Sequence, residues 1–224
     1  MHPMRDVILH SGSYEKKIAS SASTLVAAID LGFANKKKSC GCAYKLPDKP
    51  IKKDELQFGQ CIKKTSKLLK DCSKAILVIE APLSGLFSEE GNPIPRGNFE
   101  KRASGGNSDR YWYCQSGAAM CLAAIFFLRE LRAELEGNPN GQASPIDIEL
   151  YEGFVTFKEK ATDHGHDAEQ LLDAFLRCQD RDIDRVIAAD GGTVVTVMDV
   201  IGGIRRSLSP PPIIIPKLGI ALEH

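Results

Sequence analysis

Two short apolar runs, each ending in an acidic residue, constrain the fold of this chain more than any other feature. The first run, TLVAAID, covers residues 24–30, and the second, AILVIE, covers residues 75–80. A continuous apolar run of this length is typical of a strand that is buried on both faces. Such strands form the interior of parallel sheets whose two faces are covered by helices. The pattern therefore predicts an α/β protein.

The other segments are predicted to add further strands and several helices around these two runs. Residues 39–44 (SCGCAY) are expected to form a hairpin with the first run, and residues 146–154 a further strand. Helices are expected over residues 58–72, 111–136 and 166–178. Residues 45–54 and the Gly- and Pro-rich residues 84–109 are expected to be loops. This order predicts a three-layer α/β fold with a mixed central sheet flanked by helices.

The length of the chain, 224 residues, suits one sizeable domain, and neither a repeat nor a composition shift marks a second one. We predict an irregular N-terminal lead-in over residues 1–23 and the main domain over residues 24–182. Residues 183–221 are expected to form a C-terminal extension packed on the same domain. Residues 222–224 (LEH) are interpreted as the remnant of an expression tag.

Charge and cysteine content favour a cytoplasmic protein without a membrane anchor. Twenty-nine basic residues balance twenty-nine acidic ones, so the whole-chain charge is uninformative about a polyanionic partner. The seven cysteines include no Cys-x-x-Cys pair, and no segment resembles a signal peptide, which predicts reduced thiols. The apolar residues 118–128 are too few to cross a bilayer.

Three acidic residues are the candidates for a functional site. Asp30 and Glu80 end the two buried strands. If these strands are parallel neighbours, both carboxylates lie at the sheet end where open α/β sheets bind ligands. Asp167 lies in the first turn of the last predicted helix, which can bring it to the same place. The cluster suits two Mg²⁺ or Mn²⁺ ions assisting phosphodiester hydrolysis. Each acid alone is more often a turn former or a helix cap, so the hypothesis depends on their combination.

The order of these motifs resembles the ribonuclease H-like superfamily, and within it the Holliday-junction-resolvase-like predicted nucleases. The matching stretches are VAAIDLG (26–32), ILVIEAPL (76–83), IELYEGF (148–154) and HDAEQLLDAF (166–175). The resemblance implies a ribonuclease H-like domain over residues 24–182. It also implies a two-metal site in which Asp30, Glu80 and Asp167 are the catalytic and metal-binding residues. Because resolvases work as dimers, the resemblance admits a homodimer.

The last motif departs from the resolvase pattern. Resolvases commonly carry two aspartates three residues apart on that helix, whereas Gln170 stands three residues after Asp167 here. Additional site residues are therefore sought among the remaining acidic and histidine side chains nearby. The candidates are Glu152, Asp163, His166 and Asp173. His164 and His166 flank this helix and are expected either to act as a general base or to support the ligands, or to be capping or surface residues.

Basic residues follow Glu80 in the chain. Arg96, Arg102 and Arg110 lie in and beside the segment 84–109, and guanidinium groups match phosphate oxygens. They are expected to bind a nucleic-acid substrate, either DNA or RNA. Lysines are also dense between residues 36 and 74, where they form either a second positive surface for nucleic acid or a merely solvated face.

Two alternatives to a nuclease stay open at this point. Gln170 is consistent with a catalytically inactive ribonuclease H-like scaffold that binds nucleic acid or protein. Residues 30–32 (DLG) and 190–193 (DGGT) also resemble phosphate loops of actin-like ATPases and sugar kinases. Those proteins need a second domain after the later loop, and only 31 residues (224 minus 193) follow Thr193. This length disfavours the kinase-type alternative.

Overall fold

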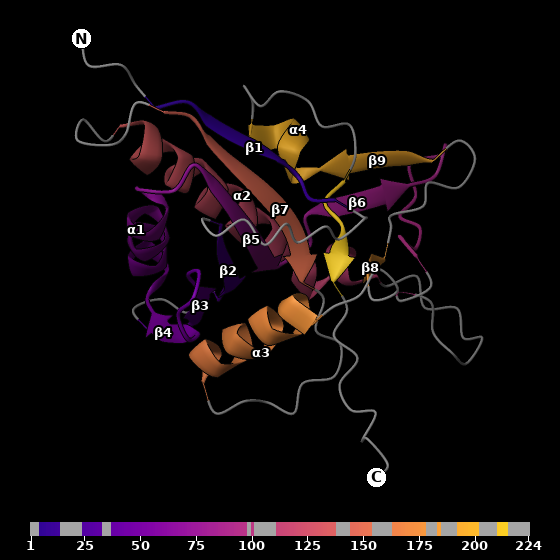
Figure 1. The fold of residues 1–224 in the computed structure, drawn as a ribbon. Coiled ribbons are helices and arrows are strands. Elements are labelled where there is room, and N and C mark those ends of the chain that lie inside the picture. Colours follow the sequence, from indigo (N-terminus) through magenta and orange to yellow (C-terminus); the bar gives the residue numbers. More distant parts are fainter. Residues whose placement is uncertain are drawn as a thin grey trace.

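The fold was obtained as a computed structural model and is drawn in Figure 1. The structure describes residues 5–13, 24–32, 37–97, 100, 111–137, 144–153, 163–177, 183–184, 192–201 and 210–214. The strands in these ranges are β1 (Val7–Ser11), β2 (Leu25–Asp30), β3 (Cys40–Lys45), β4 (Lys52–Leu56), β5 (Lys74–Glu80), β6 (Ser84–Phe87), β7 (Ile146–Gly153), β8 (Ile183–Asp184), β9 (Thr193–Thr196) and β10 (Ile213–Ile214). The helices are α1 (Phe58–Leu69), the 3-10 helix η2 (Trp112–Cys114), α2 (Ser116–Glu136), α3 (His164–Arg177) and α4 (Val197–Ile201).

Eight of the described strands form one mixed sheet. Its order is β4-β3-β2-β5-β7-β10-β8, and β1 also pairs with β7. The strands β2, β5 and β7 are parallel neighbours, whereas β3 and β4 run antiparallel as a hairpin beside β2. Both β1 and β10 run parallel to β7, along its first and last residues respectively. The strands β6 and β9 form a separate two-stranded sheet.

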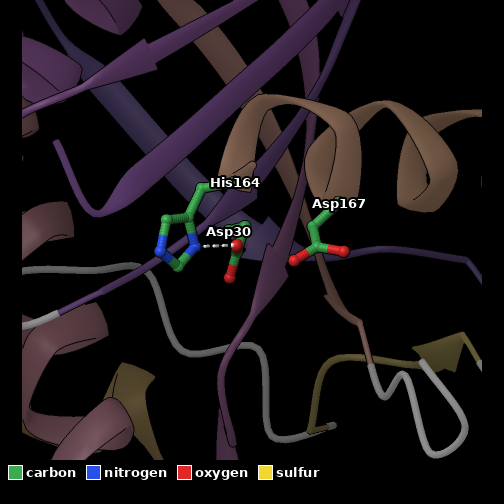
Figure 2. A group of neighbouring side chains, drawn as sticks. All are labelled: Asp30, His164 and Asp167. Atoms are coloured by element: carbon green, nitrogen blue, oxygen red, sulfur yellow. Dashed lines mark hydrogen bonds and ion pairs between the residues drawn. The ribbon is translucent and has the colours of Figure 1, made fainter. Parts of the chain in front are cut away.

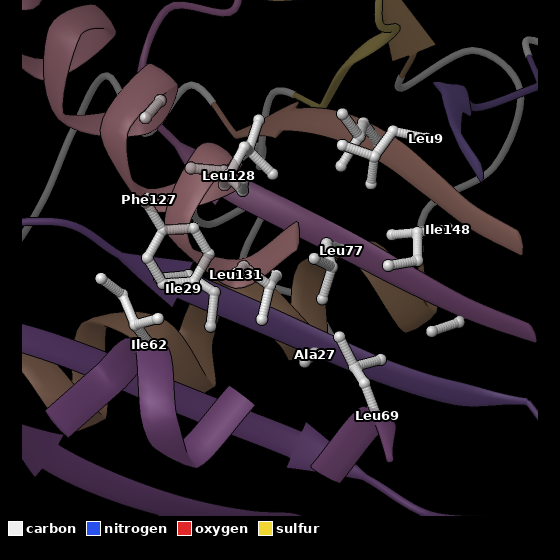
Figure 3. Close-up of a cluster of buried hydrophobic side chains, with 14 of the residues drawn as sticks. Leu9, Ala27, Ile29, Ile62, Leu69, Leu77, Phe127, Leu128, Leu131 and Ile148 are labelled. Atoms are coloured by element: carbon white, nitrogen blue, oxygen red, sulfur yellow. The ribbon is translucent and has the colours of Figure 1, made fainter. Parts of the chain in front are cut away.

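Helices cover both faces of the main sheet and complete three layers. Successive residues of a strand point to opposite faces, so Ala27 and Ile29 of β2 lie on one side and Ala28 on the other. Ala27 and Ile29 pack in the larger core cluster with Ile62 of α1 and Phe127 of α2 (Figure 3). Ala28 packs in the second cluster, under α3. The predicted three-layer α/β fold with a mixed sheet is confirmed.

Three strands lie in segments that the sequence analysis treats as irregular. The predicted lead-in is wrong for residues 7–11, because β1 buries Val7 and Leu9 beside β7. The predicted loop 45–54 overlaps β4, an edge strand whose charged residues hide the usual apolar pattern. The predicted loop 84–109 begins with β6, whose partner β9 lies far along the chain and leaves no local sequence signal.

Arg5 ties the N-terminal segment to the end of α1. Its side chain is only 3% exposed and donates hydrogen bonds to the carbonyl oxygens of Leu69, Lys70, Cys72 and Ser144. The last carbonyls of a helix have no partner within the helix. Arg5 therefore caps α1 and connects it to the segment before β7.

The segment after residue 182 adds to the same domain, since β8 and β10 join the main sheet and α4 packs against α2. The six cysteines of the described ranges are free thiols. No helix in these ranges has both the length and the apolar composition needed to span a bilayer. Residues 222–224, interpreted as a tag remnant, lie outside the described ranges.

Candidate metal centre

Asp30 and Glu80 lie side by side at the same end of the sheet. The strands β2 and β5 are parallel, and the register pairs Asp30 with Glu80. Asp30 alternates with Ala28, and Glu80 with Val78, so both side chains belong to the face covered by α3. The expectation that both acids emerge at one end of neighbouring parallel strands is confirmed.

The start of α3 is set by Asp163, which precedes its first residue. The Asp163 carboxylate accepts a hydrogen bond of 2.7 Å from the backbone N–H of His166, as a helix N-cap does. The helix therefore starts at His164, two residues earlier than the sequence analysis predicts. Because residues three apart on a helix are neighbours, His164 and Asp167 lie on one side of the first turn.

Gly41 allows this first turn to lie directly on the sheet. It pairs with Asp30 across the β2–β3 ladder, and the turn lies over it. A Cβ atom at Gly41 would lie 1.8 Å from the carbonyl oxygen of His164 and 2.9 Å from the Cβ of Ala168. Both distances are far shorter than any van der Waals contact. The missing side chain at this position is therefore what lets α3 approach Asp30.

These elements bring Asp30, His164 and Asp167 into one cluster (Figure 2). Each residue offers a potential ligand atom, and these atoms lie within 4.8 Å of one another. His164 Nδ1 and Asp30 Oδ2 are 2.7 Å apart, a hydrogen-bond distance. Asp30 is buried, whereas the His164 side chain is 41% exposed. The cluster is thus anchored in the sheet and open to solvent on the His164 side.

The donor atoms of this cluster fit a divalent metal ion. Two carboxylates within 4.8 Å repel one another when both are ionised, and a bound cation offsets that repulsion. Carboxylate oxygens suit Mg²⁺ and Mn²⁺, whereas an imidazole nitrogen is more typical of transition metals. Asp30 and Asp167 were predicted to be ligands, whereas His164 was expected only as a general base, a supporting group or a capping or surface residue. Glu80 lies beside Asp30 but outside the cluster of atoms within 4.8 Å.

The other acidic and histidine candidates have different partners. Asp163 caps α3, as described above. His166 Nδ1 lies 3.3 Å from Lys53 Nζ and from Glu169 Oε2, at the β4 edge. The Asp173 carboxylate lies 3.8 Å from Arg177, one turn further along the exposed side of α3. The structure brings none of these three into the cluster.

Glu152 lies on the opposite face of the sheet from Asp30. It pairs in register with Ile79, whose side chain belongs to the core beneath α1 and α2. The Glu152 carboxylate is fully buried and lies 2.8 Å from Arg96 Nη1. Burial raises the pKa of Glu152, and the opposing charge of Arg96 limits that rise. A position on the far face contradicts the expectation that Glu152 joins the metal ligands.

Arg96 is also buried, which contradicts its expected role as a substrate-binding residue. Its guanidinium has no exposed surface and forms ion pairs with Glu152 and Glu100. Burial alone would lower the pKa of Arg96, but the charges of these two carboxylates raise it above its ordinary value. Arg102 and Arg110, the other two predicted substrate contacts, lie outside the described residues.

His164 belongs to the cluster as a possible ligand, a role that the sequence did not predict for it. The signal for it is the pair Asp163 and Asp167, an acid just before a helix and an acid in its first turn. Recognising Asp163 as the N-cap places His164 at the first helical position, three residues before Asp167. The resolvase pattern pointed instead to the position three residues after Asp167, which is Gln170 in this chain.

Together the fold and the site define a three-layer α/β protein with a carboxylate–imidazole cluster at the C-terminal ends of two parallel strands. Comparisons with protein-family models, with curated proteins and with solved structures found no match to this chain.

Proposed function

We propose that this chain is a divalent-metal-dependent nuclease that hydrolyses phosphodiester bonds in DNA or RNA. The observation that carries the proposal is the cluster of Asp30, His164 and Asp167, with Glu80 beside Asp30 on the same face. Two acids and a histidine from distant parts of the chain meet at the sheet end where α/β proteins bind ligands, and a third acid, Glu80, lies beside Asp30. A bound cation would offset the repulsion between these neighbouring carboxylates.

The resemblance to ribonuclease H-like nucleases supports the same proposal. Its elements are a strand ending in an acid, an antiparallel hairpin, a parallel strand ending in a second acid and a late helix bearing a third. In this protein the late helix covers the face to which the first two acids point. A cytoplasmic location, expected from the cysteine content, and a homodimeric state, admitted by the resemblance, also belong to the proposal.

Each residue has a distinct role in the proposed site. Asp30 and Asp167 hold the cation through carboxylate oxygens, and Glu80 contributes a further carboxylate from the neighbouring strand. Mg²⁺ or Mn²⁺ ions, two in the resolvase-like arrangement, supply an activated water and stabilise the leaving oxygen when bound. His164 either adds a nitrogen ligand or orients the Asp30 carboxylate through its 2.7 Å contact.

Metal-dependent stabilisation and cleavage test the proposal. Because a ligand that binds only the folded state raises its stability, Mn²⁺ at 100 times its Kd should raise the Tm by about 5–10 °C. Mn²⁺ or Mg²⁺ should also support cleavage of labelled single-stranded, duplex or branched DNA or RNA. Asp30→Asn should lose both effects and keep the metal-free Tm.

Asp173→Asn is the matched control, because Asp173 is an exposed acid on α3 outside the cluster. It should keep both the Mn²⁺-dependent rise in Tm and the cleavage activity. If Mn²⁺ leaves the Tm of the wild-type protein unchanged and no substrate is cut, the inactive-scaffold alternative is favoured. Cleavage that persists in Asp30→Asn would rule out the proposed mechanism.

A further inference from the structure

Arg96 is held in the interior by contacts on every side of its guanidinium. Its Nε and Nη2 atoms donate to Glu100 Oε1 at 3.1 and 2.9 Å. Its Nη1 atom donates to Glu152 Oε2 at 2.8 Å and to the carbonyl oxygen of Ser84 at 3.0 Å. The ring of Tyr113 lies 5.2 Å from the guanidinium carbon. One side chain thus connects the end of β7, the start of β6 and the segment that precedes α2.

This network holds the residues that directly follow Glu80. The Glu152 oxygen that binds Arg96 also accepts a 2.8 Å hydrogen bond from the backbone N–H of Leu83. The carbonyl oxygen of Leu83 accepts a 2.9 Å hydrogen bond from the N–H of Val197. Glu152 therefore holds Leu83, three residues after Glu80, and Arg96 holds Ser84, four residues after it. On the other side, Ile79 pairs in register with Glu152 itself.

Stability alone is a weak reason for such a network. The side chains of Arg96, Glu100 and Glu152 are almost completely buried, and burying charges costs desolvation energy that their attraction only partly offsets. Apolar residues of similar volume often stabilise a protein as well or better. Unlike apolar packing, a hydrogen-bonded charge network is directional. Each of its bonds fixes the position of one donor atom relative to one acceptor atom.

We propose that Arg96 and Glu152 are positioning residues that hold Glu80 in the orientation that metal binding requires. The inference rests on the proposed function, because it assigns Glu80 a role in that metal site. The two residues act from the opposite face of the sheet, through the backbone on both sides of Glu80. Neither of them touches the metal.

The test is the Kd for Mn²⁺, measured by isothermal titration calorimetry below the melting temperature of every variant. Arg96→Met should weaken Mn²⁺ binding by about 10- to 100-fold, the usual effect of removing a group that orients a metal ligand. Arg96→Lys should recover part of this affinity. Glu152→Gln keeps the size of the side chain and an acceptor for Leu83, and should weaken binding less than Arg96→Met.

Arg5→Met is the matched control. Arg5 is also buried and also donates to several carbonyl oxygens, but these lie at the end of α1 and before β7, away from Asp30 and Glu80. This variant should lower the Tm and leave the Kd for Mn²⁺ unchanged. If the role of Arg96 were merely structural, Arg96→Met would behave in the same way, with a lower Tm and an unchanged Kd for Mn²⁺.

The outcomes separate this inference from the proposed function. If the wild-type protein binds Mn²⁺ and Asp30→Asn does not, the metal site stands. An unchanged Kd in both Arg96→Met and Glu152→Gln would then overturn the positioning role alone. An equal loss of affinity in Arg5→Met would also overturn it, because general loosening would explain the effect. A wild-type protein that does not bind Mn²⁺ would overturn both proposals.

Discussion

Replacing Gly41 with alanine perturbs the contact that brings α3 to Asp30. The new Cβ atom would lie 1.8 Å from the carbonyl oxygen of His164, whereas ordinary contact begins near 3.4 Å. The first turn of α3 must then move away by about 1.6 Å, the difference between these two distances. A change of rotamer cannot relieve this overlap, because the atom in the way belongs to the backbone.

The size of the expected effect follows from this displacement. Overpacking of a core contact costs about 1–3 kcal/mol of unfolding free energy. In a protein of this length that corresponds to a fall in Tm of about 2–12 °C. The same shift carries His164 and Asp167 away from Asp30. Since site geometry must hold to within about 0.5 Å, the Kd for Mn²⁺ should rise by an order of magnitude or more.

Urea unfolding and Mn²⁺ titration measure the two effects on one preparation of the Gly41→Ala variant. Gly59→Ala is the matched control, since Gly59 lies in α1 and a Cβ there meets no atom within 4 Å. It should leave Mn²⁺ binding unchanged and raise stability by up to about 1 kcal/mol, because alanine favours helix. Wild-type stability and Mn²⁺ affinity in Gly41→Ala would refute the placement of α3 on β3.

Two further variants test the first turn of α3. Asp163→Ala removes the N-cap and should cost about 1 kcal/mol by urea unfolding, whereas Asp163→Asn, which can still cap, should cost much less; equal losses in both would contradict the capping role. His164→Gln keeps a hydrogen-bonding group near Asp30 but removes the imidazole. It should therefore weaken Mn²⁺ binding more than Mg²⁺ binding in competition titrations, since nitrogen ligands favour transition metals, and an equal loss for both ions would argue against His164 as a ligand.

The central strands and their terminal acids are predictable from sequence for a clear physical reason. A strand buried on both faces needs a continuous apolar run, and an acid that ends such a run marks the edge of the sheet. Asp30 and Glu80 follow this rule, and parallel pairing then places them side by side. Their common face follows from the two-residue alternation of strands.

The features that sequence reasoning missed depend on contacts between distant segments. The edge strand β4 has no buried residue, and its charged sequence resembles that of a loop. Arg96 resembles any other arginine of a polar loop, and its burial depends on Glu152, which lies more than fifty residues later. The place of His164 beside Asp30 was not predicted, because the expected helix start was two residues too late. The residues near each of these positions in the sequence do not indicate which distant residues it contacts.

A crystal structure of the protein soaked in Mn²⁺, with anomalous scattering measured at the manganese edge, would locate a bound ion and its ligands. We expect a manganese peak within coordination distance of the Asp30 and Asp167 carboxylates, with the His164 ring turned toward it. Saturating Mn²⁺ that gives no peak there, and leaves the 2.7 Å contact between His164 and Asp30 intact, would contradict a metal-dependent nuclease.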